Sequence, residues 1–202
     1  MELKAESATM NPEIVIRDET PDDVRAITAV TIAAFKTVEI SNHAEQFIIE
    51  ALRRAGALTL SLVAEMDGPE ADGHEMDGRA MGGRVMGGRG VGHIAFSPVT
   101  VSDGTPNWYG LGPVSVLPRH QRKGIGKALI REGLSRLKGM GARGCCLVGH
   151  PGYYSKLGFK NVPGLAHDGV PPEVFFVMSF DGRTPQGTVA FHEGFKGQGE
   201  QG

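Results

Sequence analysis

The chain has 202 residues, which favours one domain, and its 40% hydrophobic and 22% charged residues are typical of globular rather than disordered proteins. Its 21 basic and 23 acidic residues give a net charge of −2, so there is no bulk attraction for nucleic acid or anionic lipid. No apolar run approaches the ~18 residues of a membrane helix, and the first residues lack the apolar stretch of a secretory signal, so we expect a cytoplasmic protein.

The first part of the chain predicts one strand followed by two helices. Residues 14–20 are rich in β-branched residues and predict a strand. Thr20 and Pro21 then form a typical helix start, with Thr20 as the N-cap. Residues 43–56 have the apolar spacing of a second helix, which ends at Gly56. The residues expected to face inward are Val24, Ile27, Val30 or Thr31, and Ala34 on the first helix, and Phe47, Ile48, Ala51 and Leu52 on the second.

Two β-rich runs flank a segment that cannot form a core. Residues 58–66 and 91–101 predict strands that pair antiparallel. Between them, residues 67–90 are rich in Gly, Met and Arg, repeat the phrase MGGR and hold no aromatic residue. We expect a flexible, inert surface insertion there, with a ligand-gating lid as the alternative. Binding of nucleic acid through its arginines is poorly supported, because no aromatic residues alternate with them.

The second half of the chain predicts strands that alternate with helices. Residues 108–118 predict a strand that Pro118 closes, and a helix follows over residues 123–140. Residues 144–149 are wholly apolar, as in a strand covered on both faces. After them we expect a short helix around Tyr153–Leu157 and strands over residues 174–180 and 187–192. The resulting order, β-α-α-β-β-β-α-β-α-β-β, predicts an α/β fold with a mixed sheet and helices on its faces.

The cysteines and histidines argue against disulfide-stapled and metal-binding classes. Cys145 and Cys146 are adjacent, which makes a disulfide between them improbable. Neighbouring strand residues point to opposite faces, and no His–Asp pair is placed to activate either thiol, so we expect both to pack in the core. The seven histidines show no paired metal-ligand spacing, so no metal is expected.

Residues 111–130 carry the clearest chemical signal of the chain. A strand ends at Pro118, a basic turn follows, and Gly124 and Gly126 open a helix. Glycines let a ligand approach the backbone closely, and the free amides of a helix's first turn attract anions. The basic residues around this turn are Arg122, Lys123 and Lys127. The pattern predicts a site for a phosphate or pyrophosphate.

The residues alone leave the phosphate ligand open. An ATP-binding P-loop would need glycine in place of Gln121 and serine or threonine in place of Ala128. A dinucleotide-binding fingerprint would need glycine in place of Leu129 and an acidic residue for the ribose. An ordinary capped helix with basic surface residues is the alternative to any ligand site.

Two motifs in this order resemble the GNAT superfamily of N-acetyltransferases. Residues 121–126 read QRKGIG and match the family signature Q/R-x-x-G-x-G/A, after a strand whose last residues, 116–118, read VLP. Tyr154 precedes a Gly-Phe pair by four residues, which matches the second hallmark. The resemblance covers about residues 13–192 and is strongest to a bacterial branch with GHI-F-SPV, LGP-V-P and YY-GF phrases.

The resemblance implies a fold and a reaction. The fold would be a single GNAT domain over residues 13–192 with a splayed central sheet, flexible termini at 1–12 and 193–202, and the insertion at 67–90. The reaction would transfer an acetyl group from acetyl-CoA to a small-molecule or peptide amine by direct attack. No metal, membrane or nucleic acid is expected as a partner, and a homodimer is allowed. The alternative is a non-catalytic acyl-CoA-binding sensor.

The resemblance also implies roles for particular residues. Tyr154 would be the general acid that protonates the departing CoA thiolate. Val114 and Val116 would offer main-chain groups to the pantetheine arm. The remaining cofactor-binding residues, around the pyrophosphate, would be Gln121, Arg122, Lys123, Gly124, Ile125, Gly126 and Lys127.

The sequence leaves the identity of the general base open, and the residues near Tyr154 and the other histidines are assigned only general roles. His150, Glu45 or a water chain would accept the amine proton. His93 lies in the middle of a predicted strand and is expected to be structural. Tyr153 is expected to pack or to line the entrance. An asparagine that contacts CoA in many relatives has no counterpart in residues 147–151.

Overall fold

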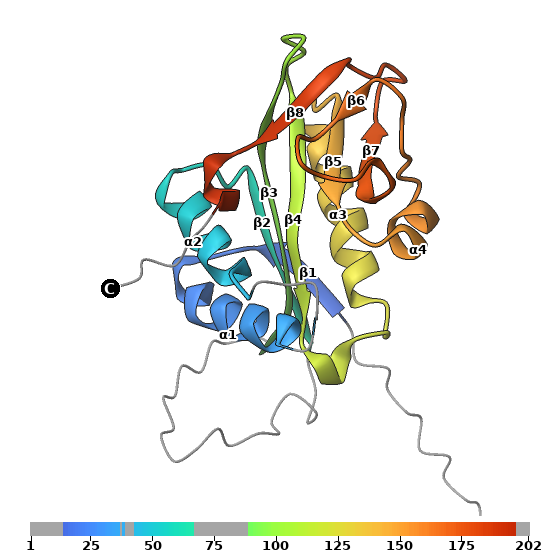
Figure 1. Ribbon diagram of the computed structural model, residues 1–202. Helices are drawn as coiled ribbons and strands as arrows, with labels where there is room; N and C mark the ends of the chain where they lie inside the picture. The colour runs from blue at the N-terminus through green and yellow to red at the C-terminus, as the bar shows by residue number, and fades with distance from the viewer. Residues whose placement is uncertain (1–13, 37, 39–42, 67–88, 197–202) are drawn as a thin grey trace, which may run out of the picture.

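The computed structural model describes residues 14–36, 38, 43–66 and 89–196, which fold into a mixed sheet with helices on both faces (Figure 1). The sheet has eight strands in the order β1-β2-β3-β4-β5-β7, while β8 pairs with β3 and β6. Neighbours are antiparallel except β4 with β5 and β6 with β8. The strands are β1 (Ile14–Asp18), β2 (Leu60–Met66), β3 (Arg89–Val101), β4 (Trp108–Val116), β5 (Gly144–Val148), β6 (Leu165–Ala166), β7 (Phe175–Ser179) and β8 (Gly187–Phe191).

Helices α1 and α2 cover one face of the sheet, and α3 and α4 lie on the other (Figure 1). None of the helices within the described residues is long and apolar enough to cross a membrane. The α-helices are α1 (Val24–Phe35), α2 (Glu45–Arg54), α3 (Ile125–Gly139) and α4 (Pro151–Tyr154), and the short 3-10 helices are η1 (Pro21–Asp23), η3 (Pro118–His120), η4 (Ser155–Leu157), η5 (Pro172–Val174) and η6 (Glu193–Lys196).

The predicted order of elements is confirmed, with three local differences. The two-residue strand β6 was not predicted, because so short a segment carries no periodic signal. Strand β3 begins at Arg89, two residues inside the predicted insertion, because Arg89 and Gly90 continue the pairing with β2. Residues 193–196 were expected in a flexible terminus but form η6, which packs on α2 with Gly194 buried. The rest of the predicted insertion, 67–88, lies outside the described residues.

The buried face of α2 differs from the predicted one. Phe47 was expected to face inward but is 41% exposed, whereas Ile49 is 1% exposed and packs with Ile27 and Val63. Three consecutive apolar residues, 47–49, allow two apolar stripes, and the packing against β2 and α1 selects the one through Ile49 and Leu52. On α1 the predicted inward residues Ile27, Val30, Thr31 and Ala34 are buried, whereas Val24 is only partly buried. On α3 the apolar residues Ile125, Leu129, Leu134 and Leu137 are buried.

Strands β4 and β5 pair only at their beginnings. Their register joins Trp108 to Gly144, Tyr109 to Cys145 and Gly110 to Cys146. Beyond Gly110, β4 stays with β3, with an irregularity in the register, and β5 stays with β7 up to Val148. The two central strands therefore part, which confirms the expected splayed sheet.

Candidate active site

The free edge of β4 faces the place where β5 has moved away. The amide of Leu117 donates to the carbonyl of Val91 on β3 at 2.9 Å. Main-chain groups alternate in direction along a strand, so those of Ser115 also face β3 while those of Val114 and Val116 face the opposite side. Gln121 confirms this direction, because its Nε2 donates to the Val116 carbonyl at 3.0 Å. Val114 and Val116 thus offer main-chain groups that β5 does not bind.

The turn after β4 leads into the unblocked N-terminus of α3. Arg122 has a φ of +61° and Gly124, the N-cap, a φ of +92°, so both residues lie in the left-handed region. No side chain caps the helix, and its first hydrogen bond runs from the Ala128 amide to the Gly124 carbonyl at 3.0 Å. The amides of residues 125–127 therefore have no partner within the helix.

The surroundings of this N-terminus fit an anionic ligand. A Cβ placed on Gly124 would meet no atom within 4 Å, so the approach to the amides is open. The first turn contains no acidic residue, and the exposed residues around it include Arg122, Lys123 and Lys127. A Cβ on Gly126 would lie 3.7 Å from Cγ2 of Val116, so the first helical turn adjoins the end of β4. Helix dipole, free amides and basic side chains all favour negative charge here.

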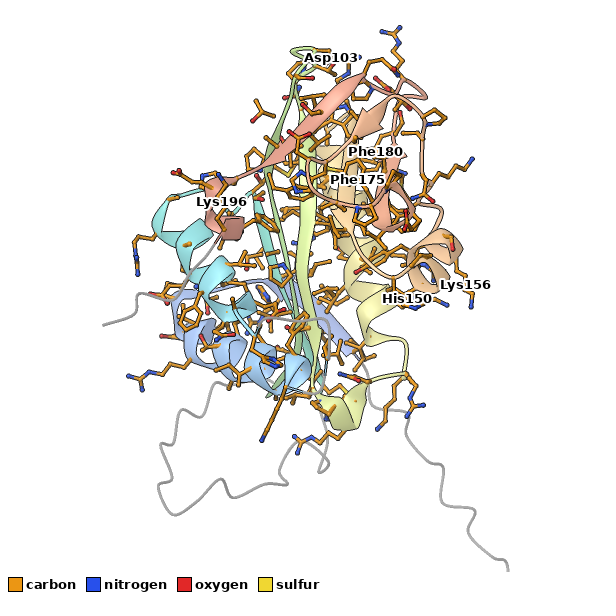
Figure 2. All side chains as sticks on the ribbon, viewed as in Figure 1. Asp103, His150, Lys156, Phe175, Phe180 and Lys196 are labelled. Atoms are coloured by element: carbon orange, nitrogen blue, oxygen red, sulfur yellow. The ribbon has the colours of Figure 1, made fainter. Side chains whose placement is uncertain are left out.

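Tyr154 is fixed beside the end of β5. His150 caps α4 by accepting the Gly152 amide on Nδ1 at 3.1 Å, and it lies on the α3 side of the molecule (Figure 2). The Tyr154 ring lies 6.0 Å from the Phe159 ring and 6.4 Å from the Phe176 ring, centroid to centroid. A Cβ on Gly149, the residue after β5, would collide with the Tyr154 ring, so glycine is required there. The ring is therefore held from several directions.

The Tyr154 hydroxyl has the properties of a proton donor. Burial raises its pKa above the ordinary value of 10, so the phenol is protonated at neutral pH. Within the described part of the chain it makes no hydrogen bond. Its proton is thus not engaged by another group of the described residues.

Tyr153 links α4 to α3. Its ring meets the Tyr154 ring edge to face with centroids 5.0 Å apart. A Cβ on Gly126 would lie 3.1 Å from the Tyr153 hydroxyl oxygen, so this hydroxyl lies next to the first turn of α3. Tyr153 is 39% exposed, so it lies at the surface of the molecule.

The two side chains considered as bases differ in their positions. The Nδ1 atom of His150 accepts the Gly152 amide, so this nitrogen is engaged in capping α4. Glu45 begins α2, on the opposite face of the sheet from α4.

A buried polar network under α1 and α2 was not found from the sequence. His93 Nε2 lies 2.8 Å from Ser61 Oγ, which donates to Glu19, and Arg53 Nε donates to Glu19 at 2.7 Å. Burial alone would raise the pKa of Glu19, but hydrogen bonds from His93, Arg53 and Ser61 outweigh it and lower the pKa to about 2. Burial lowers the pKa of His93, so the ring is neutral and fixed in the core. A structural His93 is what the sequence predicted.

The cysteines are buried free thiols whose pKa values are raised by burial. A thiol that stays protonated is a poor nucleophile, so core packing is confirmed for Cys145 and Cys146. Among residues 14–36, 38, 43–66 and 89–196, no group of three or more His, Cys, Asp and Glu could hold a metal ion.

Comparisons with known proteins agree on one family. Residues 79–161 match the model of the acetyltransferase (GNAT) domain. The uncharacterized N-acetyltransferase YhbS of Escherichia coli K12 is 31% identical over 147 residues, which is 73% of this chain and 74% of YhbS.

Two solved structures are similar over nearly the whole chain. A GNAT family acetyltransferase from Brucella melitensis, in complex with acetyl-CoA, is 46% identical with a TM-score of 0.72 over 91% of this chain and 98% of its own. The structure of YhbS from Escherichia coli, in complex with CoA, is 29% identical in sequence and has a TM-score of 0.74. The match covers 92% of this chain and 93% of YhbS.

Proposed function

Because this chain belongs to the GNAT family of N-acetyltransferases, we propose that it moves an acetyl group from acetyl-CoA to a primary amine by direct attack in a ternary complex. The observation that carries this proposal is the parting of β4 and β5 after Gly110. The proposal is supported by the contact between the first turn of α3 and Val116 on the free edge of β4, and by the packing of Tyr154 on Gly149 just after β5. The similar structures from B. melitensis and E. coli, which hold acetyl-CoA and CoA, support the same ligand.

The elongated shape of acetyl-CoA fits the order of the binding groups. Val114 and Val116 would pair their main-chain groups with the amides of the pantetheine arm, as a neighbouring strand would. The turn and first helical residues would hold the pyrophosphate through their amides and positive charge. These residues are Gln121, Arg122, Lys123, Gly124, Ile125, Gly126 and Lys127.

Tyr154 would complete the chemistry at the sulfur. The amine nitrogen attacks the thioester carbonyl carbon, and the C–S bond breaks as the tetrahedral intermediate collapses. Tyr154 gives its phenolic proton to the sulfur, so that a neutral thiol leaves. The proton of the amine leaves to His150, to Glu45 or to water. The acceptor is a small-molecule or peptide amine.

Calorimetric titration of acetyl-CoA and CoA into the protein and into Gly124→Glu tests the cofactor site. The new carboxylate would stand where the pyrophosphate binds, so we expect at least about a tenfold loss of affinity. Gly124→Ala is the matched control, since it carries the same positive-φ strain without the charge.

Gly139→Glu is a second control, because it places the same charge in open space at the far end of α3. Binding that survives in both controls and fails in Gly124→Glu supports the proposal. A folded protein that binds neither acetyl-CoA nor CoA would overturn it. Binding without transfer to any amine would favour an acyl-CoA sensor instead.

A further inference from the structure

The adjacent tyrosines of α4 face two different parts of the site. Successive helical residues point about 100° apart, so the side chains of Tyr153 and Tyr154 leave α4 in different directions. Tyr154 packs on Gly149, Phe159 and Phe176, beside the end of β5. Tyr153 reaches instead across to the first turn of α3, with its hydroxyl above Gly126.

We propose that Tyr153 is a cofactor-binding residue whose hydroxyl donates a hydrogen bond to the pyrophosphate of acetyl-CoA. This inference rests on the proposed placement of that pyrophosphate at the N-terminus of α3. It gives the two neighbouring phenols separate tasks: Tyr153 binds the donor, and Tyr154 protonates the leaving sulfur.

The chemistry of a helix N-terminus supports this assignment. The main-chain groups that end there are N–H donors, so they offer no acceptor for the phenolic proton of Tyr153. Within the described residues this hydroxyl makes no hydrogen bond. An anion above Gly126 would accept from the amides and from Tyr153 together, and hydrogen bonds to a charged acceptor are stronger than those to a neutral one. Burial raises the pKa of Tyr153, which keeps the proton in place for donation.

The absence of a side chain at Gly126 supports the same geometry. A Cβ there would lie 3.1 Å from the Tyr153 hydroxyl oxygen, closer than an ordinary van der Waals contact. Glycine therefore leaves room for the hydroxyl beside the first turn of α3. The edge-to-face contact with the Tyr154 ring supports the Tyr153 ring from its own helix. Tyr153 is thus oriented before any ligand arrives.

Tyr153→Phe tests the proposal because it removes only the hydroxyl. We expect the Kd for CoA to rise about tenfold, as for the loss of one hydrogen bond to a charged group that is partly exposed. The Kd for S-acetylpantetheine, which lacks the pyrophosphate, should stay within about twofold. Both dissociation constants are measured by titration calorimetry.

Tyr109→Phe is the matched control, since Tyr109 packs against the core cluster at the start of β4. An unchanged Kd for CoA in Tyr153→Phe would overturn the proposal. An equal loss of affinity for CoA and S-acetylpantetheine would also overturn it, because the ring would then position the pantetheine arm. Failure of the unsubstituted protein to bind either ligand would instead overturn the proposed function.

Discussion

Tyr154 combines a fixed ring with an unbonded hydroxyl. The ring contacts the rings of Phe159 and Phe176, and it packs against the backbone at Gly149, where a side chain would collide with it. Burial raises the pKa of the phenol, so the acid form persists above the ordinary value of 10. A phenol with a raised pKa is a weaker acid in water, but the thiolate it faces in the proposed reaction is a strong enough base in a partly dry site.

Tyr154→Phe should lower kcat by about 10²- to 10³-fold, because loss of general acid catalysis typically costs this much. The Kd for CoA should change less than about twofold, since the ring that packs on Gly149 is retained. Steady-state kinetics and calorimetry measure the two values, with Tyr109→Phe as the control for loss of a hydroxyl. A Tyr154→Phe enzyme with unchanged kcat would mean that water protonates the sulfur.

At the scale of one element, α2 shows how packing selects a face. Ile49 and Leu52 are buried, and Leu52 also contacts the position of Gly194 in η6. Phe47, one of the larger apolar side chains of the helix, is 41% exposed. The helix is therefore fixed between β2 on one side and the C-terminal segment on the other.

Ile49→Ala and Phe47→Ala form a matched pair on this helix. Ile49→Ala should lower the free energy of unfolding by about 2–4 kcal/mol, because it leaves a cavity against Val63. Phe47→Ala should cost under about 1 kcal/mol, since much of the ring is in water. Urea unfolding followed by circular dichroism measures both. Equal losses in the two variants would contradict the observed orientation of α2.

Across the whole molecule, one polar network joins several elements. Glu19 follows β1, Ser61 lies on β2, His93 on β3 and Arg53 on α2. The carboxylate of Glu19 accepts from both Arg53 and Ser61, so its ionised form is stabilised only in the folded chain. The stability of the fold should therefore depend on pH.

The sign follows from the two pKa values of Glu19. Its pKa is about 2 in the folded protein against 4.5 as the ordinary value, so its contribution is complete above pH 4.5 and is lost as pH falls toward 2. This difference corresponds to about 3 kcal/mol, and because the carboxylate is only half buried, solvent screening reduces the expected loss over that window to about 2 kcal/mol. The pKa of His93 is lowered too, so stability also declines as pH falls below 6.5.

The variant Glu19→Gln tests how much the Glu19 carboxylate contributes to the pH dependence of stability. The variant should be less stable at pH 7 and should show a shallower decline between about pH 4.5 and pH 2, measured by thermal unfolding. Glu50→Gln is the control, because Glu50 pairs with Arg54 on the exposed side of α2. If Glu19→Gln and the unsubstituted protein lose the same stability between about pH 4.5 and pH 2, groups other than Glu19 cause the pH dependence of stability.

The order of the elements and the chemistry of the main turn could be predicted from the sequence because both are local. Residues 121–126 and the helix after them carry their own glycines, basic residues and apolar spacing. Tyr154 and its Gly-Phe pair lie within one short segment as well. The missed strand β6 and the wrong face of α2 involve signals too short or too ambiguous to decide without the neighbouring elements.

By itself, the sequence determined the family motifs, the anion-attracting turn and the residues that bear the proposed chemistry. Only the tertiary structure decided where β4 and β5 part, because that depends on the register of each strand with its other neighbour. It also decided that Tyr153 lies over Gly126 and that Glu19 accepts from Ser61, 42 positions away. Contacts between distant positions arise when sheets and helices pack together, and no local pattern encodes them.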